Sequence, residues 1–96
     1  MARGVVRVGV IGTGFARATQ LPVLRALPGV EIAIIASGKR ENAVRAAAEH
    51  GIPRAAASWE EVTGDPSLDL VVISTPPFLH HPMALAAIRN RKHVLC

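Results

Sequence analysis

Four runs of apolar, mostly β-branched residues recur along the chain, at residues 5–11, 30–36, 68–74 and 93–96. Each run is nearly continuous rather than alternating, which is typical of strands buried on both faces of a parallel sheet. A shorter run at residues 55–58 predicts an edge strand.

The segments between these runs carry alanines and leucines at helical spacing. They predict a helix after residue 14 that Pro22 interrupts, a helix over residues 41–50 that Gly51 ends, and one helical turn at residues 59–62. A last helix, over residues 81–90, is expected to turn five apolar side chains inward: Met83, Ala84, Leu85, Ala87 and Ile88. Because strands and helices alternate with short loops, we predict an α/β fold. We expect a Rossmann-like doubly wound parallel sheet of about five strands with helices on both faces.

Composition narrows the class of protein. With 96 residues the chain is one domain or part of one, and its 50% of apolar residues excludes a disordered chain. No apolar run reaches the roughly 18 residues of a membrane span, and the N-terminus shows no signal peptide. The single cysteine, Cys96, excludes a disulfide framework, and no spacing of His, Cys and Asp predicts a metal site. We therefore expect a cytoplasmic protein with no membrane partner.

The chain is basic, with 11 Lys and Arg against 7 Asp and Glu and a formal net charge of +4. The arginines are scattered, and stacking aromatics are scarce, with two Phe, one Trp and no Tyr. We therefore predict no nucleic-acid partner; that alternative requires a DNA affinity that falls steeply with salt. The positive balance also suits an anionic small molecule such as a phosphate-bearing cofactor.

A glycine-rich turn joins the first predicted strand to the first predicted helix, with the sequence G-V-I-G-T-G-F at residues 9–15. Strand, Gly-x-Gly turn and helix in this order are the context of a dinucleotide fingerprint, in which Gly12 permits the turn and Gly14 lets the backbone approach the pyrophosphate. The N-terminus of the helix then offers free N–H groups to the phosphates. The third small position falls on Arg17, and a purely structural turn with incidental glycines is the alternative.

The loop after the second predicted strand lacks an acidic residue. In sites of this type that take NAD, a carboxylate at this position accepts hydrogen bonds from the adenosine ribose. Here Ser37 takes that place, and Lys39 and Arg40 follow. A carboxylate would repel a 2′-phosphate, whereas a hydroxyl and two cations attract it, and Arg40 can bind it with two hydrogen bonds. We therefore predict NADP as the preferred cofactor, with NAD as the alternative.

The second half of the chain resembles a known family. Residues 68–80 (L-D-L-V-V-I-S-T-P-P-F-L-H) and 87–96 (A-I-R-N-R-K-H-V-L-C) resemble the Gfo/Idh/MocA oxidoreductases, which include glucose–fructose oxidoreductase and inositol 2-dehydrogenase. With residues 8–14 and the Leu21-Pro22 pair, the resemblance spans the whole chain.

The resemblance implies a nicotinamide-dependent dehydrogenase with an N-terminal Rossmann domain and a C-terminal α/β substrate domain. It implies that four residues line the pyrophosphate: Gly12, Thr13, Gly14 and Phe15. The adenosine end would be held by Ser37, Lys39 and Arg40. The route to the nicotinamide would be lined by Thr75, Pro76, Phe78 and His80.

The chain departs from the family pattern in places. Pro77 stands where the family often has Asn, which removes one polar contact to the cofactor. Arg91 replaces a Gly, so we expect Asn90 or Arg91 to take the left-handed conformation that ends a helix. The family's Glu-Lys-Pro, whose Lys takes part in catalysis, would follow Cys96. We therefore expect residues 1–96 to be a dinucleotide-binding domain without catalytic residues, cut before the substrate domain.

Several single residues have plain structural interpretations. We expect His81 to be exposed at a helix start and His80 to have a structural or cofactor-lining role. His50 would end a helix and His93 would make a buried or edge hydrogen bond. We further expect Trp59 to cover one edge of the sheet and Cys96 to lie in the core of the last strand.

Two classes of function remain. The first is the cofactor-binding portion of an oxidoreductase that transfers hydride between a nicotinamide and a CH–OH or C=O carbon of a sugar, polyol or related small molecule. The resemblance implies a homo-oligomer formed through the substrate domain, and we expect residues 1–96 alone to be inactive. The second is a non-catalytic NADP(H)-sensing or binding module of the same fold. Glu-Lys-Pro directly after Cys96 would favour the enzyme.

Overall fold

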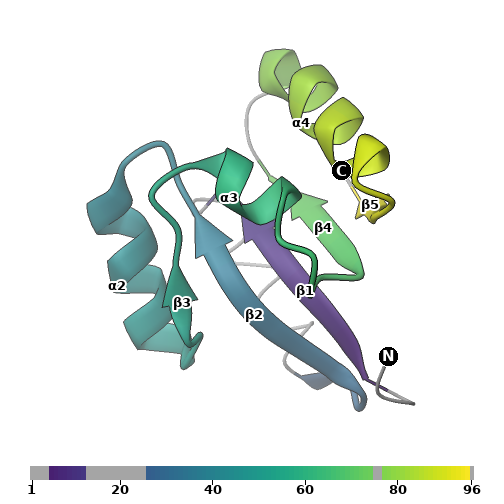
Figure 1. The fold of residues 1–96 in the computed structure, drawn as a ribbon. Coiled ribbons are helices and arrows are strands. Elements are labelled where there is room, and N and C mark those ends of the chain that lie inside the picture. Colours follow the sequence, from purple (N-terminus) through teal and green to yellow (C-terminus); the bar gives the residue numbers. More distant parts are fainter. Residues whose placement is uncertain (1–4, 13–25, 75–76, 96) are drawn as a thin grey trace.

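The computed structural model describes residues 5–12, 26–74 and 77–95. In these ranges five strands form one parallel sheet in the order β3-β2-β1-β4-β5 (Figure 1). The strands are β1 (Val6–Ile11), β2 (Val30–Ala36), β3 (Arg54–Ala55), β4 (Leu70–Ile73) and β5 (His93–Leu95). The described helices are α2 (Arg40–His50), α3 (Trp59–Thr63) and α4 (Pro77–Arg89). The strand order reverses between β1 and β4, which confirms the Rossmann-like doubly wound fold.

Helices cover both faces of the sheet. On one face, small residues of α2 pack against a cluster that includes Val8, Val10 and Ile35. On the other face, α3 and α4 cover a second cluster that includes Ile34 and Val71. The buried residues of α2 are all alanines (Ala43, Ala46 and Ala47), so this helix can lie close to the sheet without large side chains between them.

The start of α4 differs from the prediction. The helix begins at Pro77 rather than at residue 81, and Pro82 lies inside it. Proline suits the first position of a helix because the backbone nitrogen there needs no partner, so Pro77 can begin α4. Pro82, in contrast, has no N–H to donate to the carbonyl of Phe78 one turn earlier.

The inward face of α4 is narrower than expected. Met83 and Ala87 are buried and Ala84 is half-buried, but Leu85 is 38% exposed and Ile88 is 61% exposed. Met83 and Ala87 lie one turn apart and define the buried stripe, whereas Leu85 and Ile88 lie on the other side of the helix. The predicted helix after residue 14, with its interruption at Pro22, lies outside the described residues.

Two predicted backbone features are confirmed at the ends of helices. Gly51 takes a left-handed conformation (φ 67°) after α2, and its N–H donates to the carbonyl of Ala47. Of the two candidates after α4, it is Arg91 that has the positive φ, at 60°. The N–H of Arg91 then donates to the Ile88 carbonyl over 2.9 Å, which ends the helix as a left-handed residue does.

A β-bulge interrupts the pairing of β2 with β1. Val8 pairs with Ile32 and Gly9 with Ile34, so Ala33 has no partner in β1. The extra residue places two consecutive side chains, Ala33 and Ile34, in the same hydrophobic cluster. Ile32 and Ile35 lie in the cluster on the opposite face. The bulge therefore shifts the alternation of side chains in the second half of β2.

Gly9 lies opposite the bulge and under α3. A Cβ at this position would lie 2.5 Å from Cγ1 of Val62 and 2.6 Å from Cδ1 of Leu68. Val62 belongs to α3, and Leu68 lies in the loop that leads to β4. The missing side chain at Gly9 is therefore what allows α3 and this loop to pack directly on the central strand.

We predict that Gly9→Ala lowers the free energy of unfolding by about 1–3 kcal/mol, because the core has no room for the added methyl group. The matched control is Gly38→Ala: a Cβ on Gly38 would meet nothing within 4 Å. That control should change stability by less than about 0.5 kcal/mol. Chemical denaturation of the three chains measures both values, and equal stability of the two variants would contradict the close approach at Gly9.

Asp65 ties the loop between α3 and β4 to the edge strand β3. Its carboxylate accepts hydrogen bonds from the backbone N–H (2.8 Å) and the hydroxyl (2.7 Å) of Ser67, and it pairs with the guanidinium of Arg54. Burial alone would raise the pKa of Asp65, but the hydrogen bonds from Ser67 and the charge of Arg54 outweigh it and lower the pKa below the usual 3.8. A carboxyl whose pKa is lowered by folding stabilises the folded chain fully above its usual pKa of 3.8. This contribution is lost as the pH falls through the lowered pKa of the folded chain.

We predict that Asp65→Asn lowers the free energy of unfolding by about 1–2 kcal/mol at neutral pH. The difference from the parent chain should shrink in acid, because the parent carboxyl is then protonated as well. Urea denaturation at about pH 7 and about pH 2.5 measures the two differences. Glu31→Gln is the control, since it removes an exposed ion pair with Arg7 (2.9 Å) worth at most about 1 kcal/mol. If Asp65→Asn lowered the free energy of unfolding by the same amount at both pH values, the prediction would be refuted.

Candidate functional site

The carboxyl ends of three central strands meet at one edge of the sheet, where backbone hydrogen bonds hold them level. The N–H of Gly12, after β1, donates to the carbonyl of Ala36 at the end of β2 over 2.8 Å. The N–H of Ser74, after β4, donates to the carbonyl of Ile11 over 2.8 Å. The segments that follow β1, β2 and β4 therefore start side by side at this edge (Figure 1), which is where ligands bind in open α/β sheets.

Gly12 has the backbone that the predicted turn requires. Its φ is 103°, a value that residues with a side chain rarely adopt, and the residue is buried. The other three residues predicted at the pyrophosphate, Thr13, Gly14 and Phe15, lie outside the described residues. The structure thus describes the first residue of the predicted turn, held by its bond to the end of β2.

The loop between β2 and α2 places the predicted adenosine-binding residues next to Gly12. Ser37 follows β2 directly and is half-buried, and Lys39 and Arg40 are exposed. Within the described ranges, no carboxylate pairs with either cation. Gly38 leaves open space beside the loop, because a Cβ there would contact nothing within 4 Å. The loop therefore presents two accessible positive charges.

The N-terminus of α2 adds backbone donors to these charges. Lys39 is the N-cap residue, and no side chain caps the helix there. The carbonyl of Lys39 accepts hydrogen bonds from the N–H groups of Asn42 and Ala43, whereas the first N–H groups of a helix have no acceptor within the helix. This end of α2 carries partial positive charge and favours an anion.

The residues predicted at the nicotinamide follow β4. Thr75 and Pro76 lie outside the described residues. Phe78 and His80 lie in the first turn of α4, and their side chains are likewise outside the described part. Because α4 starts at the carboxyl end of β4, its first turn lies at the same edge as Gly12 and Ser37. Ser74, which sequence analysis did not single out, aligns β4 with β1 through its backbone; only its position at the strand end could have indicated this.

The single residues named in the sequence analysis meet the expectations only in part. His50 is the last residue of α2, and Trp59 is half-buried against the cluster under α3. His81 is exposed, but it lies in the second turn of α4 rather than at its start. His93 is an exposed residue of the edge strand β5, and its N–H donates to the carbonyl of Asp69 over 3.0 Å. Cys96 lies outside the described residues.

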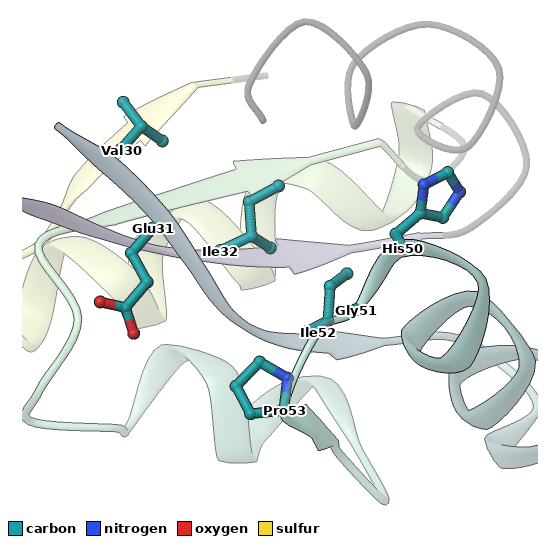
Figure 2. A pocket seen from close by; sticks show the side chains of 7 residues that line it. All are labelled: Val30, Glu31, Ile32, His50, Gly51, Ile52 and Pro53. Carbon is teal, nitrogen blue, oxygen red and sulfur yellow. The ribbon is translucent and has the colours of Figure 1, made fainter. Parts of the chain in front are cut away.

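A pocket of about 370 Å³ lies at the opposite end of β2. It is lined by Val30, Glu31, Ile32, His50, Gly51, Ile52 and Pro53 (Figure 2). In Figure 2 the side chains of Val30, Ile32 and Ile52 point to one side of β2, whereas Glu31 points to the other. The pocket is separated from Gly12 and Ser37 by the length of β2, so it is not part of the predicted nucleotide site.

The described ranges contain no helix with the length and apolar character needed to cross a membrane. They also contain no group of three or more His, Cys, Asp or Glu side chains placed to hold a metal ion.

Comparison with known proteins identifies the family. Residues 6–96 match the model of the Gfo/Idh/MocA oxidoreductase family, NAD-binding Rossmann fold. The chain is 42% identical over 91 residues to 1,5-anhydro-D-fructose reductase from Ensifer adhaerens, which covers 94% of this chain and 27% of the relative.

Solved structures give the same result. Biliverdin reductase from Synechocystis sp. PCC 6803, in complex with biliverdin and NADP⁺, has a TM-score of 0.84 at 35% identity and covers 93% of this chain and 28% of its own. Levoglucosan dehydrogenase in complex with NADH and levoglucosan has a TM-score of 0.80 at 30% identity, with 95% and 27% covered.

The chain therefore spans about a quarter of the length of the relatives it matches. The match includes all five strands, the glycine turn and both later motifs. The chain belongs to the Gfo/Idh/MocA oxidoreductase family, as an NAD-binding Rossmann domain.

Proposed function

We propose that residues 1–96 are the dinucleotide-binding domain of an oxidoreductase that prefers NADP to NAD. The observation that carries this proposal is the loop between β2 and α2. It has Ser37 where an NAD site has a carboxylate, and it has two exposed cations, Lys39 and Arg40, that no described carboxylate neutralises. A 2′-phosphate is the part of NADP that such a loop distinguishes from NAD.

The residues of the carboxyl edge fit the shape and charge of the dinucleotide. The pyrophosphate would lie beside the turn that begins at Gly12, whose positive φ of 103° allows the chain to turn there. The adenosine would extend over the end of β2, with its 2′-phosphate near Ser37, Lys39 and Arg40. The uncapped start of α2 would add N–H donors to the same phosphate. Relatives with NADP⁺ and with NADH are both known, so the preference rests on this chain's own loop.

The chain's residues would bind and orient the cofactor rather than carry out bond cleavage. When bound, the nicotinamide donates or accepts the hydride. Because the ends of β1 and β4 are held level by the bond from Ser74 to Ile11, a dinucleotide anchored at Gly12 would extend from β2 towards the start of α4. Thr75, Pro76, Phe78 and His80 would line that end and exclude water from it.

For the longer enzyme, we propose a sugar, polyol or related small molecule with a CH–OH or C=O carbon as the substrate. Relatives named for 1,5-anhydro-D-fructose and levoglucosan support this substrate class. Since the relatives are about four times as long, we place the substrate domain, the catalytic lysine and any homo-oligomer contact outside residues 1–96. We expect these 96 residues alone to bind NADP without turnover.

Calorimetric titration with NADP⁺ and NAD⁺ tests the cofactor preference. We predict tighter binding of NADP⁺, and we predict that Arg40→Ala weakens NADP⁺ binding about tenfold or more while NAD⁺ binding stays unchanged, since a hydrogen bond to a charged group is worth about 1.5–3 kcal/mol. Arg45→Ala is the matched control, because Arg45 is an exposed arginine farther along α2 and should affect neither cofactor.

A second variant introduces a negative charge at the end of β2. Ser37→Asp should weaken NADP⁺ binding by repulsion and strengthen NAD⁺ binding, because the carboxylate can accept hydrogen bonds from the ribose. Circular dichroism of each variant verifies the fold before titration. Equal affinity of the parent chain for the two cofactors would overturn the preference, and binding of neither would overturn the nucleotide site.

A further inference from the structure

Within the described part of the chain, nothing binds the hydroxyl of Ser58 at the start of α3. Ser58 is the N-cap residue of this helix, a position from which serine ordinarily accepts a hydrogen bond from the first turn. Here the side chain makes no capping bond. The carboxylate of Glu61 instead reaches back and accepts a hydrogen bond from the N–H of Ala57 over 3.0 Å. Among the described residues, the half-buried Ser58 hydroxyl therefore has no partner.

Ser58 lies in the short loop between β3 and α3, beside the strand that leads into the proposed 2′-phosphate loop. β3 pairs with β2 in parallel, with Ala55 opposite Ile35, and the N–H of Ala56 donates to the carbonyl of Ile35 over 2.8 Å. Ile35 and Ala55 are the last pair of this ladder, and Ser37 and Ser58 follow them along their own segments by two and three residues. Ser58 is itself extended (φ −152°, ψ 162°), so the chain continues past the end of β3 towards the same edge (Figure 1).

The surroundings suit a phosphate between the two segments. Gly38 leaves the space beside it open, because a Cβ there would contact nothing within 4 Å. Lys39 and Arg40 supply positive charge at this corner. The carboxylates of Glu41, Glu60 and Glu61 are all exposed to solvent, which screens their charge, and Glu61 accepts a hydrogen bond from the N–H of Ala57.

The order of the strands determines which part of the cofactor reaches Ser58. With the pyrophosphate at β1 and the ribose at β2, the two groups on the ribose, the adenine and the 2′-phosphate, would extend towards β3. A 2′-phosphate has three terminal oxygens, each of which can accept a hydrogen bond, so a serine hydroxyl from the loop after β3 could bind alongside the cations from the loop after β2.

We propose that Ser58 is a specificity-determining residue that donates a hydrogen bond to the 2′-phosphate of NADP from the side opposite to Lys39 and Arg40. This rests on the proposed NADP site and adds a ligand from a different loop, the one between β3 and α3. Because the hydroxyl caps no N–H group, its role in binding is separable from the stability of α3.

Three substitutions, titrated with NADP⁺ and NAD⁺, test the proposal. Ser58→Ala should weaken NADP⁺ binding about threefold to tenfold and leave NAD⁺ binding unchanged. Ser58→Asp and Ser58→Asn form a matched pair, since both residues are favourable N-caps that preserve the helix start and they differ in charge. The NADP⁺-to-NAD⁺ affinity ratio should be at least about tenfold lower for the Asp variant than for the Asn variant.

The outcomes separate this proposal from the one on which it rests. If Ser58→Ala weakens the binding of both cofactors equally, the hydroxyl contacts a part that they share, and its role in specificity is overturned. If Ser58→Ala and Ser58→Asp leave the affinity for both cofactors unchanged while Arg40→Ala still lowers the affinity for NADP⁺, the Ser58 contact is overturned and the loop site stands. If the parent chain shows no preference for NADP⁺, both are overturned. Thermal unfolding of each variant shows whether a loss of binding reflects a loss of fold.

Discussion

The absence of a side chain at Gly9 is the constraint on which the arrangement of this sheet depends. It lets Val62 of α3 and Leu68 of the following loop pack within contact of the central strand. That loop leads into β4, which pairs with β1 from Val8 to Ile11. The pairing brings Ser74 beside Ile11, and the other side of β1 brings Gly12 beside Ala36. The close packing at Gly9 therefore helps to position β4, and the pairing of β4 with β1 positions the edge at which the nucleotide site is proposed.

The two ends of the sheet use charge in different ways. At the amino end, two ion pairs join neighbouring elements: Arg7 with Glu31, and Arg54 with Asp65. At the carboxyl end, the described cations Lys39 and Arg40 have no such partner. Charge at one end therefore serves the fold, while charge at the other remains accessible to an anion.

The parts of the fold that follow from local signals could be predicted from sequence. The bounds of β2 match its apolar run, and Gly51 and Arg91 end their helices as expected. The start of α4 could not be predicted, because Pro77 and Pro82 are both acceptable at a helix start and only the folded chain distinguishes them. The bulge at Ala33 was equally hidden, since a strand with apolar residues on both faces carries no alternation from which a shift could be detected.

The candidate site was predictable in outline because parallel strands bring their carboxyl ends to one edge, so that order along the chain already places Gly12 beside Ser37. The availability of the Ser58 hydroxyl could not be predicted from the sequence. A serine before a helical turn is ordinarily explained as a cap, and only the structure shows that Glu61 binds the neighbouring N–H while Ser58 makes no capping bond.

The bulge in β2 has a consequence for how this domain can vary in evolution. Deleting Ala33 would remove the extra position and leave regular pairing, because Ile34 would still lie opposite Gly9 and Ile35 opposite Val10. The residues after the bulge would keep their faces, with Ile35 on the side of α2 and Ile34 on the side of α3. A deletion after Ile34 would instead turn the remaining residues of the strand to the opposite face. The length of β2 can therefore change by one residue at the bulge, whereas beyond the bulge it is set by the side of the sheet on which the next loop begins.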